Sequence, residues 1–82
     1  MHYQLSLSEN ARQQLRALDK TLRRNIGRRL ETMRDDLQGD VRKLEAKNNR
    51  YRLRVGSHRI LFTLVGDVIA VYRVKDRKEA YE

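Results

Sequence analysis

Cysteine and proline are both absent from this chain of 82 residues. The lack of cysteine excludes disulfide bonds, thiolate metal sites and cysteine nucleophiles. Long apolar runs are also missing, since the longest stretch, Val68–Tyr72, is too short to span a membrane. Residues 1–11 contain neither the basic leader nor the apolar run of a signal peptide. We therefore expect a cytoplasmic protein that folds as one domain over residues 1–82.

Acidic residues are scarce relative to basic ones. The chain has 19 Lys and Arg against 11 Asp and Glu, which gives a formal net charge of +8. Such a surplus favours polyanionic partners, with nucleic acid first and an acidic protein second. A membrane surface ranks third, because no predicted helix joins a basic face to a strongly apolar one. Most of the basic residues are arginines, whose planar donor groups suit phosphate oxygens.

The first half of the chain predicts one strand and two helices. Tyr3, Leu5 and Leu7 alternate with polar residues, as in a half-buried strand. Ser8 is placed to cap a short helix and Asp19 to cap a second one, which we expect to stop at Gly39. Gly27 inside the second helix costs roughly 1 kcal/mol relative to alanine, so either a close packing contact or a tolerated defect is expected there. The apolar stripe of the second helix consists of Leu22, Ile26, Leu30, Met33 and Leu37.

The second half predicts an antiparallel meander of three strands. These are Arg50–Val55, His58–Val65 and Val68–Val74, separated by Gly56-Ser57 and Gly66-Asp67, both good two-residue hairpin turns. The last two strands are apolar on nearly every residue and should lie centrally, covered by the helices. The predicted fold class is α+β, ordered β-α-α-β-β-β, with an antiparallel sheet packed against two helices.

Basic residues cluster around these strands. Arg50, Arg52 and Arg54 should project from one strand face, and Arg59 opens the next strand. Such a face could support RNA cleavage by the RNA's own 2′-hydroxyl, which needs a base, cations around the phosphorane and an acid. An alternating basic face is nevertheless more often a solvated or merely nucleic-acid-binding surface. The second helix carries a further group, which suits a soluble face, an RNA contact or an acidic partner: Arg23, Arg24, Arg28, Arg29 and Arg34.

Metal and cofactor chemistry finds little support in the sequence. His2 and His58 lie far apart along the chain and have no carboxylates at ligand spacing. The Asp35-Asp36 pair lies at the expected end of the second helix, where a solvated pair of carboxylates is more ordinary than a catalytic one. The glycines match no phosphate-binding loop pattern. We therefore expect no metal site and no cofactor.

Two blocks of sequence carry a resemblance to a known family. They are YRLRVGSHRILF at residues 51–62 and VYRVKDRKEAY at residues 71–81. Both resemble the RelE/ParE superfamily of toxins from type II toxin–antitoxin systems, and the order of elements agrees over nearly the whole chain. Resemblance to RelE implies a microbial-ribonuclease-like fold, entry into the ribosomal A site, cleavage of the messenger RNA codon there, and neutralisation by a cognate acidic antitoxin.

The resemblance also implies which residues act. The RelE positions for catalysis fall here on Arg52, Arg54, Arg59, Arg77 and Tyr81. Lys43, Lys47, Arg50, His58 and Lys75 are the residues expected to support RNA binding. Lys75 is an alternative to Arg77 for the same role.

The chain departs from the RelE pattern at two positions. It has arginines, Arg52 and Arg54, where RelE has lysines. A guanidinium holds its proton too tightly to act as a base. His58 and Lys47 are therefore alternative proton acceptors, although a histidine beside a hairpin turn more often has only a structural role. Two other functions stay open: poisoning of DNA gyrase, as in ParE-like members, and RNA binding without catalysis.

Overall fold

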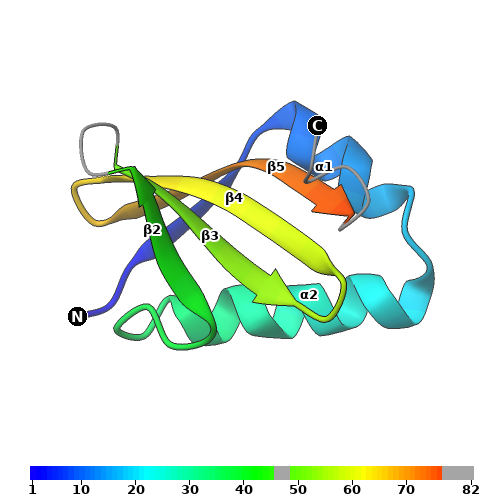
Figure 1. Ribbon diagram of the computed structural model, residues 1–82, viewed down its shortest axis with the longest axis horizontal. Coiled ribbons are helices and arrows are strands. Elements are labelled where there is room, and N and C mark those ends of the chain that lie inside the picture. Colours follow the sequence, from blue (N-terminus) through cyan, green and yellow to red (C-terminus); the bar gives the residue numbers. More distant parts are fainter. Residues whose placement is uncertain (46–48, 77–82) are drawn as a thin grey trace.

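Seven elements form a five-stranded sheet with two helices against it (Figure 1). The computed structural model describes residues 1–45 and 49–76. In chain order the elements are β1 (Gln4–Leu7), α1 (Glu9–Arg16), α2 (Lys20–Met33), β2 (Val41–Glu45), β3 (Arg50–Val55), β4 (His58–Val65) and β5 (Val68–Asp76). The strand order is β1-β5-β4-β3-β2, which places the apolar β4 at the centre as predicted. The α+β class with two helices packed on the sheet is confirmed.

The sheet differs from the predicted one in two respects. It is mixed, because β1 pairs parallel to β5 while the other neighbours are antiparallel. Alternation along a strand reports which residues are buried but not the direction of its neighbour. The sheet also contains β2, which the sequence did not predict, because only Val41 and Leu44 are apolar in this strand and they do not alternate.

Both helices begin at the predicted caps. The Ser8 hydroxyl accepts a hydrogen bond from the Ala11 amide at 3.0 Å, and the Asp19 carboxylate accepts one from the Leu22 amide at 2.7 Å. Each bond satisfies an amide that has no partner within its helix, which is the reason these residue types favour such positions.

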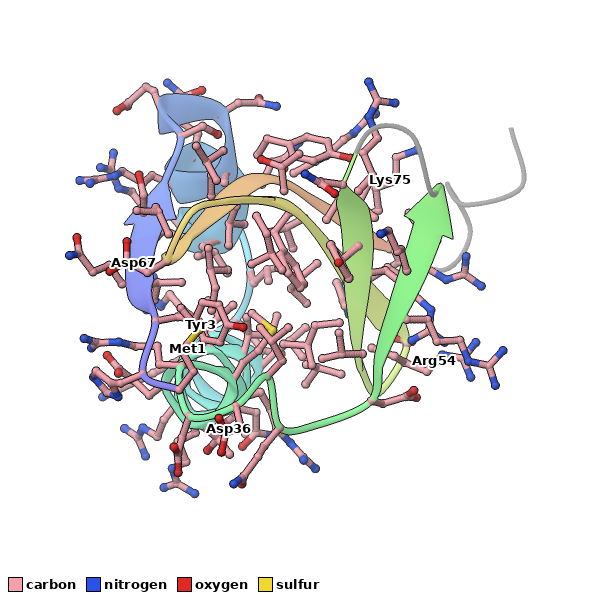
Figure 2. The ribbon with its side chains drawn as sticks, turned by 90° about the vertical axis from the view of Figure 1, so that its left-hand side faces the viewer. Met1, Tyr3, Asp36, Arg54, Asp67 and Lys75 are labelled. Atoms are coloured by element: carbon pink, nitrogen blue, oxygen red, sulfur yellow. The ribbon has the colours of Figure 1, made fainter. Side chains whose placement is uncertain are left out.

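The predicted end of the second helix was wrong. α2 stops at Met33, one turn before Leu37, and both Asp36 and Leu37 adopt positive φ angles of 56°. Two carboxylates at Asp35 and Asp36 would oppose the negative end of the helix dipole, which disfavours another turn there. Leu37 is still half-buried against the core. Its apolar side chain therefore fits the predicted stripe because it packs on the core, although it lies outside the helix. Figure 2 shows Asp36 beside Met1, whose ammonium group it binds.

The two predicted hairpin turns are present and set the register of the central strands. Gly56 and Gly66 have φ angles of 59° and 60°, a conformation open to glycine at little cost. Because each turn has only two residues, Val55 pairs with His58 and Val65 pairs with Val68.

The core lies between the two helices and the face of the sheet that they cover. Ile26, Leu30 and Met33 of α2 are almost fully buried, as are Leu53 and Phe62 of the sheet. Burying one such side chain contributes about 1.5–3 kcal/mol, so this layer supplies most of the driving force for folding. The Tyr51 and Phe62 rings stack at its edge with centroids 5.4 Å apart. Within the described parts of the chain, no helix is long and apolar enough to cross a membrane.

Candidate nucleic-acid interface

Three basic residues from three neighbouring strands form one line across the sheet. Arg54 of β3 pairs with Arg59 of β4, and Arg59 pairs with Lys75 of β5. Neighbouring strands lie about 4.8 Å apart, so the three side chains start from closely spaced points. We call Arg54, Arg59 and Lys75 the basic row. The register therefore brings together two residues predicted as catalytic and one predicted as RNA-binding.

The basic row lies on the face of the sheet opposite the helices. Its members alternate along their strands with Leu53, Ile60 and Val74, all of which are buried in the core. Arg54 is exposed, and Arg59 and Lys75 are half-buried. Figure 2 shows Arg54 projecting outward from its strand and away from the packed interior.

The charge of the basic row is not neutralised by the rest of the described chain. None of the ion pairs that the described residues form with one another involves Arg54, Arg59 or Lys75. Like charges on adjacent strands repel and so reduce stability slightly. An arrangement of this kind can bind a phosphate through several charge-assisted hydrogen bonds at once.

Two further arginines on this face were missed by the sequence analysis. The next line across the sheet joins Arg42, Arg52, Leu61 and Arg73, and both Arg42 and Arg73 are exposed. Arg42 could be assigned to this face only once β2 was known. Arg73 pairs with Leu61 next to a register shift, beyond which Phe62 pairs with Val71, so simple alternation fails there.

Arg52 shares the face of the basic row, as alternation predicted, but its guanidinium is not available there. Its side chain is only 7% exposed, and Nη1 donates to the backbone oxygen of Asp40 at 3.0 Å and to Asp40 Oδ1 at 3.3 Å. The amide of Arg54 donates to that same backbone oxygen at 3.0 Å. Arg52 therefore fixes the entry into β2, which corrects the expectation that its guanidinium would be available for catalysis.

His58 occupies a different environment from the arginines. Paired with Val55, it faces the helix side of the sheet and is 6% exposed. Its Nε2 lies 3.7 Å from Asp76 Oδ2, and its Nδ1 lies 3.3 Å from the Ser57 hydroxyl. His58 lines two hollows. One of about 100 Å³ at the hairpin turn includes Arg54 and Arg59, and one of about 280 Å³ is lined by Gln14, Ala17, Leu18, Val74 and Asp76.

The remaining predicted residues are divided between the two faces or lie outside the described residues. Lys43 is exposed but pairs with Tyr51, so it shares the helix-side face, with Nζ 5.6 Å from the centre of that ring. Arg50 is exposed on the face of the basic row, opposite Thr63. Lys47, Arg77 and Tyr81 lie outside the described residues.

The described residues offer cations rather than metal ligands. No three histidine, aspartate or glutamate side chains within residues 1–45 and 49–76 come close enough to hold a metal ion. Around the basic row, the available chemistry is the binding of an anion by guanidinium and ammonium donors, with an imidazole at the nearby hairpin turn.

The sequence of the chain is similar to those of known toxins. Residues 5–81 match the family described as "ParE toxin of type II toxin-antitoxin system, parDE". A curated relative, Toxin RelE3 of Methanocaldococcus jannaschii, is 42% identical over 48 residues, which make up 58% of this chain and 54% of the relative. The matched region thus spans only about half the length of that relative.

Solved structures of similar fold cover almost the whole chain. The RelB–RelE antitoxin–toxin complex from Methanococcus jannaschii superposes with a TM-score of 0.78 and 28% identity, over 93% of this chain and 94% of the other. The archaeal RelE–RelB complex from Pyrococcus horikoshii gives a TM-score of 0.80 and 24% identity, over 98% and 100% of the two chains. The second likeness concerns the fold alone.

Proposed function

The chain belongs to the ParE toxin family of type II toxin–antitoxin systems, and within that family we propose that it is a ribosome-dependent endoribonuclease acting on messenger RNA in the A site. The observation that supports this proposal is the basic row. Arg54, Arg59 and Lys75 meet across three strands with no described carboxylate paired to them. Such a set of cations on one sheet face suits the binding of an RNA phosphate and of the negative charge that develops on it during cleavage.

In the proposed reaction, the 2′-oxygen of a ribose attacks the adjacent phosphorus and displaces the 5′-oxygen of the next nucleotide. The products are a 2′,3′-cyclic phosphate and a free 5′-hydroxyl. The 2′-hydroxyl loses its proton to a base, and the leaving oxygen receives one from an acid. Arg54 and Arg59 hold the phosphate and stabilise the negative charge that gathers on its oxygens, while Lys75 adds a third cation.

The proposed base is His58. It borders the same small hollow as Arg54 and Arg59, and an imidazole is the side chain that most often serves as a general base. Its contacts with Asp76 and the Ser57 hydroxyl would fix the ring and its tautomer. Arg52 is left with a positioning role, because its guanidinium is buried against Asp40. Arg77 at the phosphate and Tyr81 stacked on a base complete the proposal by resemblance to RelE.

We further propose that an acidic antitoxin neutralises the chain. The similar structures from Methanococcus jannaschii and Pyrococcus horikoshii are both complexes of RelE with RelB. An antitoxin segment that folds on the toxin could place acidic side chains over the basic row, where the net charge of +8 would favour it.

Primer extension on a reporter message in a reconstituted translation reaction tests the nuclease, with purified protein, with EDTA present, and with and without ribosomes. We expect cuts inside codons that require ribosomes. The same preparation is then added to a gyrase supercoiling assay. An intact message together with inhibited supercoiling would overturn the proposal and favour the activity of ParE-like members.

A further inference from the structure

The outer side of α2 carries five basic residues that the fold does not use. The 14 residues of this helix include a single acid, Glu31. Figure 2, which views α2 nearly end-on, shows nitrogen-tipped side chains extending from its outer side. Arg34, predicted with this group, instead serves the fold, because Nε donates to the Tyr3 carbonyl at 3.0 Å. The residues left exposed are Lys20, Arg23, Arg24, Arg28 and Arg29, which we call the α2 basic face.

These five charges are uncompensated within the described chain. Glu31 pairs with Arg34 at 3.0 Å, and none of the ion pairs among the described residues includes a member of the α2 basic face. Lys20, Arg24 and Arg28 follow one another at intervals of four residues, a spacing at which like charges destabilise a helix. Within the described chain, the Asp19 cap and the burial of Ile26, Leu30 and Met33 stabilise the helix despite this repulsion.

The first turn of α2 carries two cations of the α2 basic face, Lys20 and Arg23, close to the positive end of the helix dipole. The turn contains no acid, and the carboxylate of the N-cap Asp19 offsets these cations only in part. In α1, by contrast, Glu9 lies in the first turn and Arg16 in the last, which is the favourable arrangement.

Gly27 lies among these charges and has no packing role against the residues that the structure describes. A Cβ atom built at this position would meet nothing within 4 Å, so no neighbouring element requires a glycine there. The close internal contact considered from the sequence is therefore absent. A bare backbone in the middle of an exposed, strongly basic helix would let an external partner approach closely.

We propose that the α2 basic face binds the phosphodiester backbone of double-helical RNA. Successive cations of the series Lys20, Arg24 and Arg28 rise by about 6 Å along the helix, so they can contact several phosphates in sequence. Arginine predominates in the face, and its donor fork suits phosphate oxygens.

The α2 basic face is separate from the basic row. α2 covers the inner face of the sheet through Ile26, Leu30 and Met33, whereas Arg54 projects from the outer face. A chain with both surfaces could hold structured RNA on one side and present the basic row to a single strand on the other. The choice of RNA over DNA rests on the proposed function, but the binding of phosphate does not.

The experiment compares two double variants that each remove two positive charges from a helix. Arg24→Gln/Arg28→Gln alters the α2 basic face, and Arg12→Gln/Arg16→Gln removes two exposed arginines of α1 as the matched control. Binding of a fluorescein-labelled RNA hairpin with a 16-base-pair stem is followed by anisotropy at several salt concentrations. A DNA hairpin of the same sequence and a polyglutamate peptide are measured in parallel, and circular dichroism verifies folding.

We expect the α2 variant to bind the RNA hairpin about tenfold more weakly, and its salt slope to fall by about two, because two phosphate contacts are lost. The control should lose less than about threefold, since it removes the same charge from α1, away from the α2 basic face. Arg12 Nε also donates to the Leu7 carbonyl at 3.3 Å, so the folding check applies to the control as well. Gly27→Ala should also weaken RNA binding while the helix stays intact. Equal losses in the two double variants would overturn the proposal. So would weakened peptide binding with unchanged RNA binding, or an equal effect on DNA and RNA.

Discussion

Arg52 and Arg54 lie two residues apart on the same face of β3, yet their surroundings are opposite. Arg52 is almost fully buried and donates two hydrogen bonds to Asp40, at the entry into β2. Arg54 is exposed and stands in line with Arg59 and Lys75. One arginine belongs to the fold and the other is available to a ligand. The role of an arginine is therefore decided by the groups that it contacts, and not by the strand face on which it lies.

The energetic consequences differ as well. Removing the buried Arg52 side chain takes a charged donor from the Asp40 carbonyl and leaves a cavity, and both effects are costly. An exposed arginine without a carboxylate partner contributes little to stability. Substitutions should therefore separate the two regions, with stability lost around Arg52 and activity lost in the basic row.

The largest effect is expected in the basic row. Arg59→Ala should lower the rate of ribosome-dependent cleavage by roughly a hundredfold, because one cation that stabilises the developing charge is lost. Single-turnover cleavage of a programmed ribosome measures this rate, and Arg59→Lys should recover part of it. Normal cleavage by a folded Arg59→Ala protein would remove this residue from the site.

Arg52→Ala should have the next largest effect, this time on stability. We expect a loss of about 2 kcal/mol in the free energy of unfolding, because the Asp40 carbonyl and carboxylate lose a charged donor and a cavity opens. Urea denaturation followed by circular dichroism measures it, with Arg54→Ala as the control, which should stay within about 0.5 kcal/mol of wild type. Equal stabilities for the two variants would contradict the distinction between these arginines.

Gly39→Ala tests the turn that delivers Asp40 to Arg52. Gly39 has a φ of 122°, and an added Cβ would lie 3.1 Å from Leu53 Cδ1 in the core. We expect a loss of about 1–2 kcal/mol, mostly from backbone strain, measured by the same denaturation. An unchanged midpoint would show that the turn can relax without disturbing the Asp40–Arg52 contact.

Asp40→Asn should have the smallest effect. The backbone carbonyl still accepts from Arg52, and the side chain of Asp40 is 51% exposed, so solvent screens its charge. A loss of no more than about 0.5 kcal/mol is expected. A much larger loss in denaturation would mean that the carboxylate, rather than the carbonyl, anchors Arg52.

Local chemistry made most of the fold predictable. Ser8 and Asp19 cap their helices through side-chain oxygens, and Gly56 and Gly66 supply the positive φ angles of two-residue turns. These features depend on a few adjacent residues. The parallel pairing of β1 with β5 depends on contacts between residues more than 60 positions apart, on which alternation gives no information. β2 lacked even alternation, so both β2 and Arg42 were missed.

The site was predictable only in part, for a related reason. Residue type and alternation placed Arg54 and Arg59 on one face, and the register then added Lys75. Alternation could not foresee that the loop before β2 brings Asp40 to Arg52. It also could not foresee that Asp76 comes to lie 3.7 Å from the His58 ring. Each of these outcomes depends on a segment that arrives from elsewhere in the chain.

The most direct test of the central claim uses charge reversal on the two faces of the sheet. Arg54→Glu and Lys43→Glu change the net charge equally and alter exposed residues of adjacent strands, but Arg54 belongs to the basic row whereas Lys43 pairs with Tyr51 on the other face. The measurement is the rate of ribosome-dependent cleavage by each folded variant. The account predicts that Arg54→Glu abolishes cleavage and that Lys43→Glu stays within about threefold of wild type. Equal losses in both variants would contradict it.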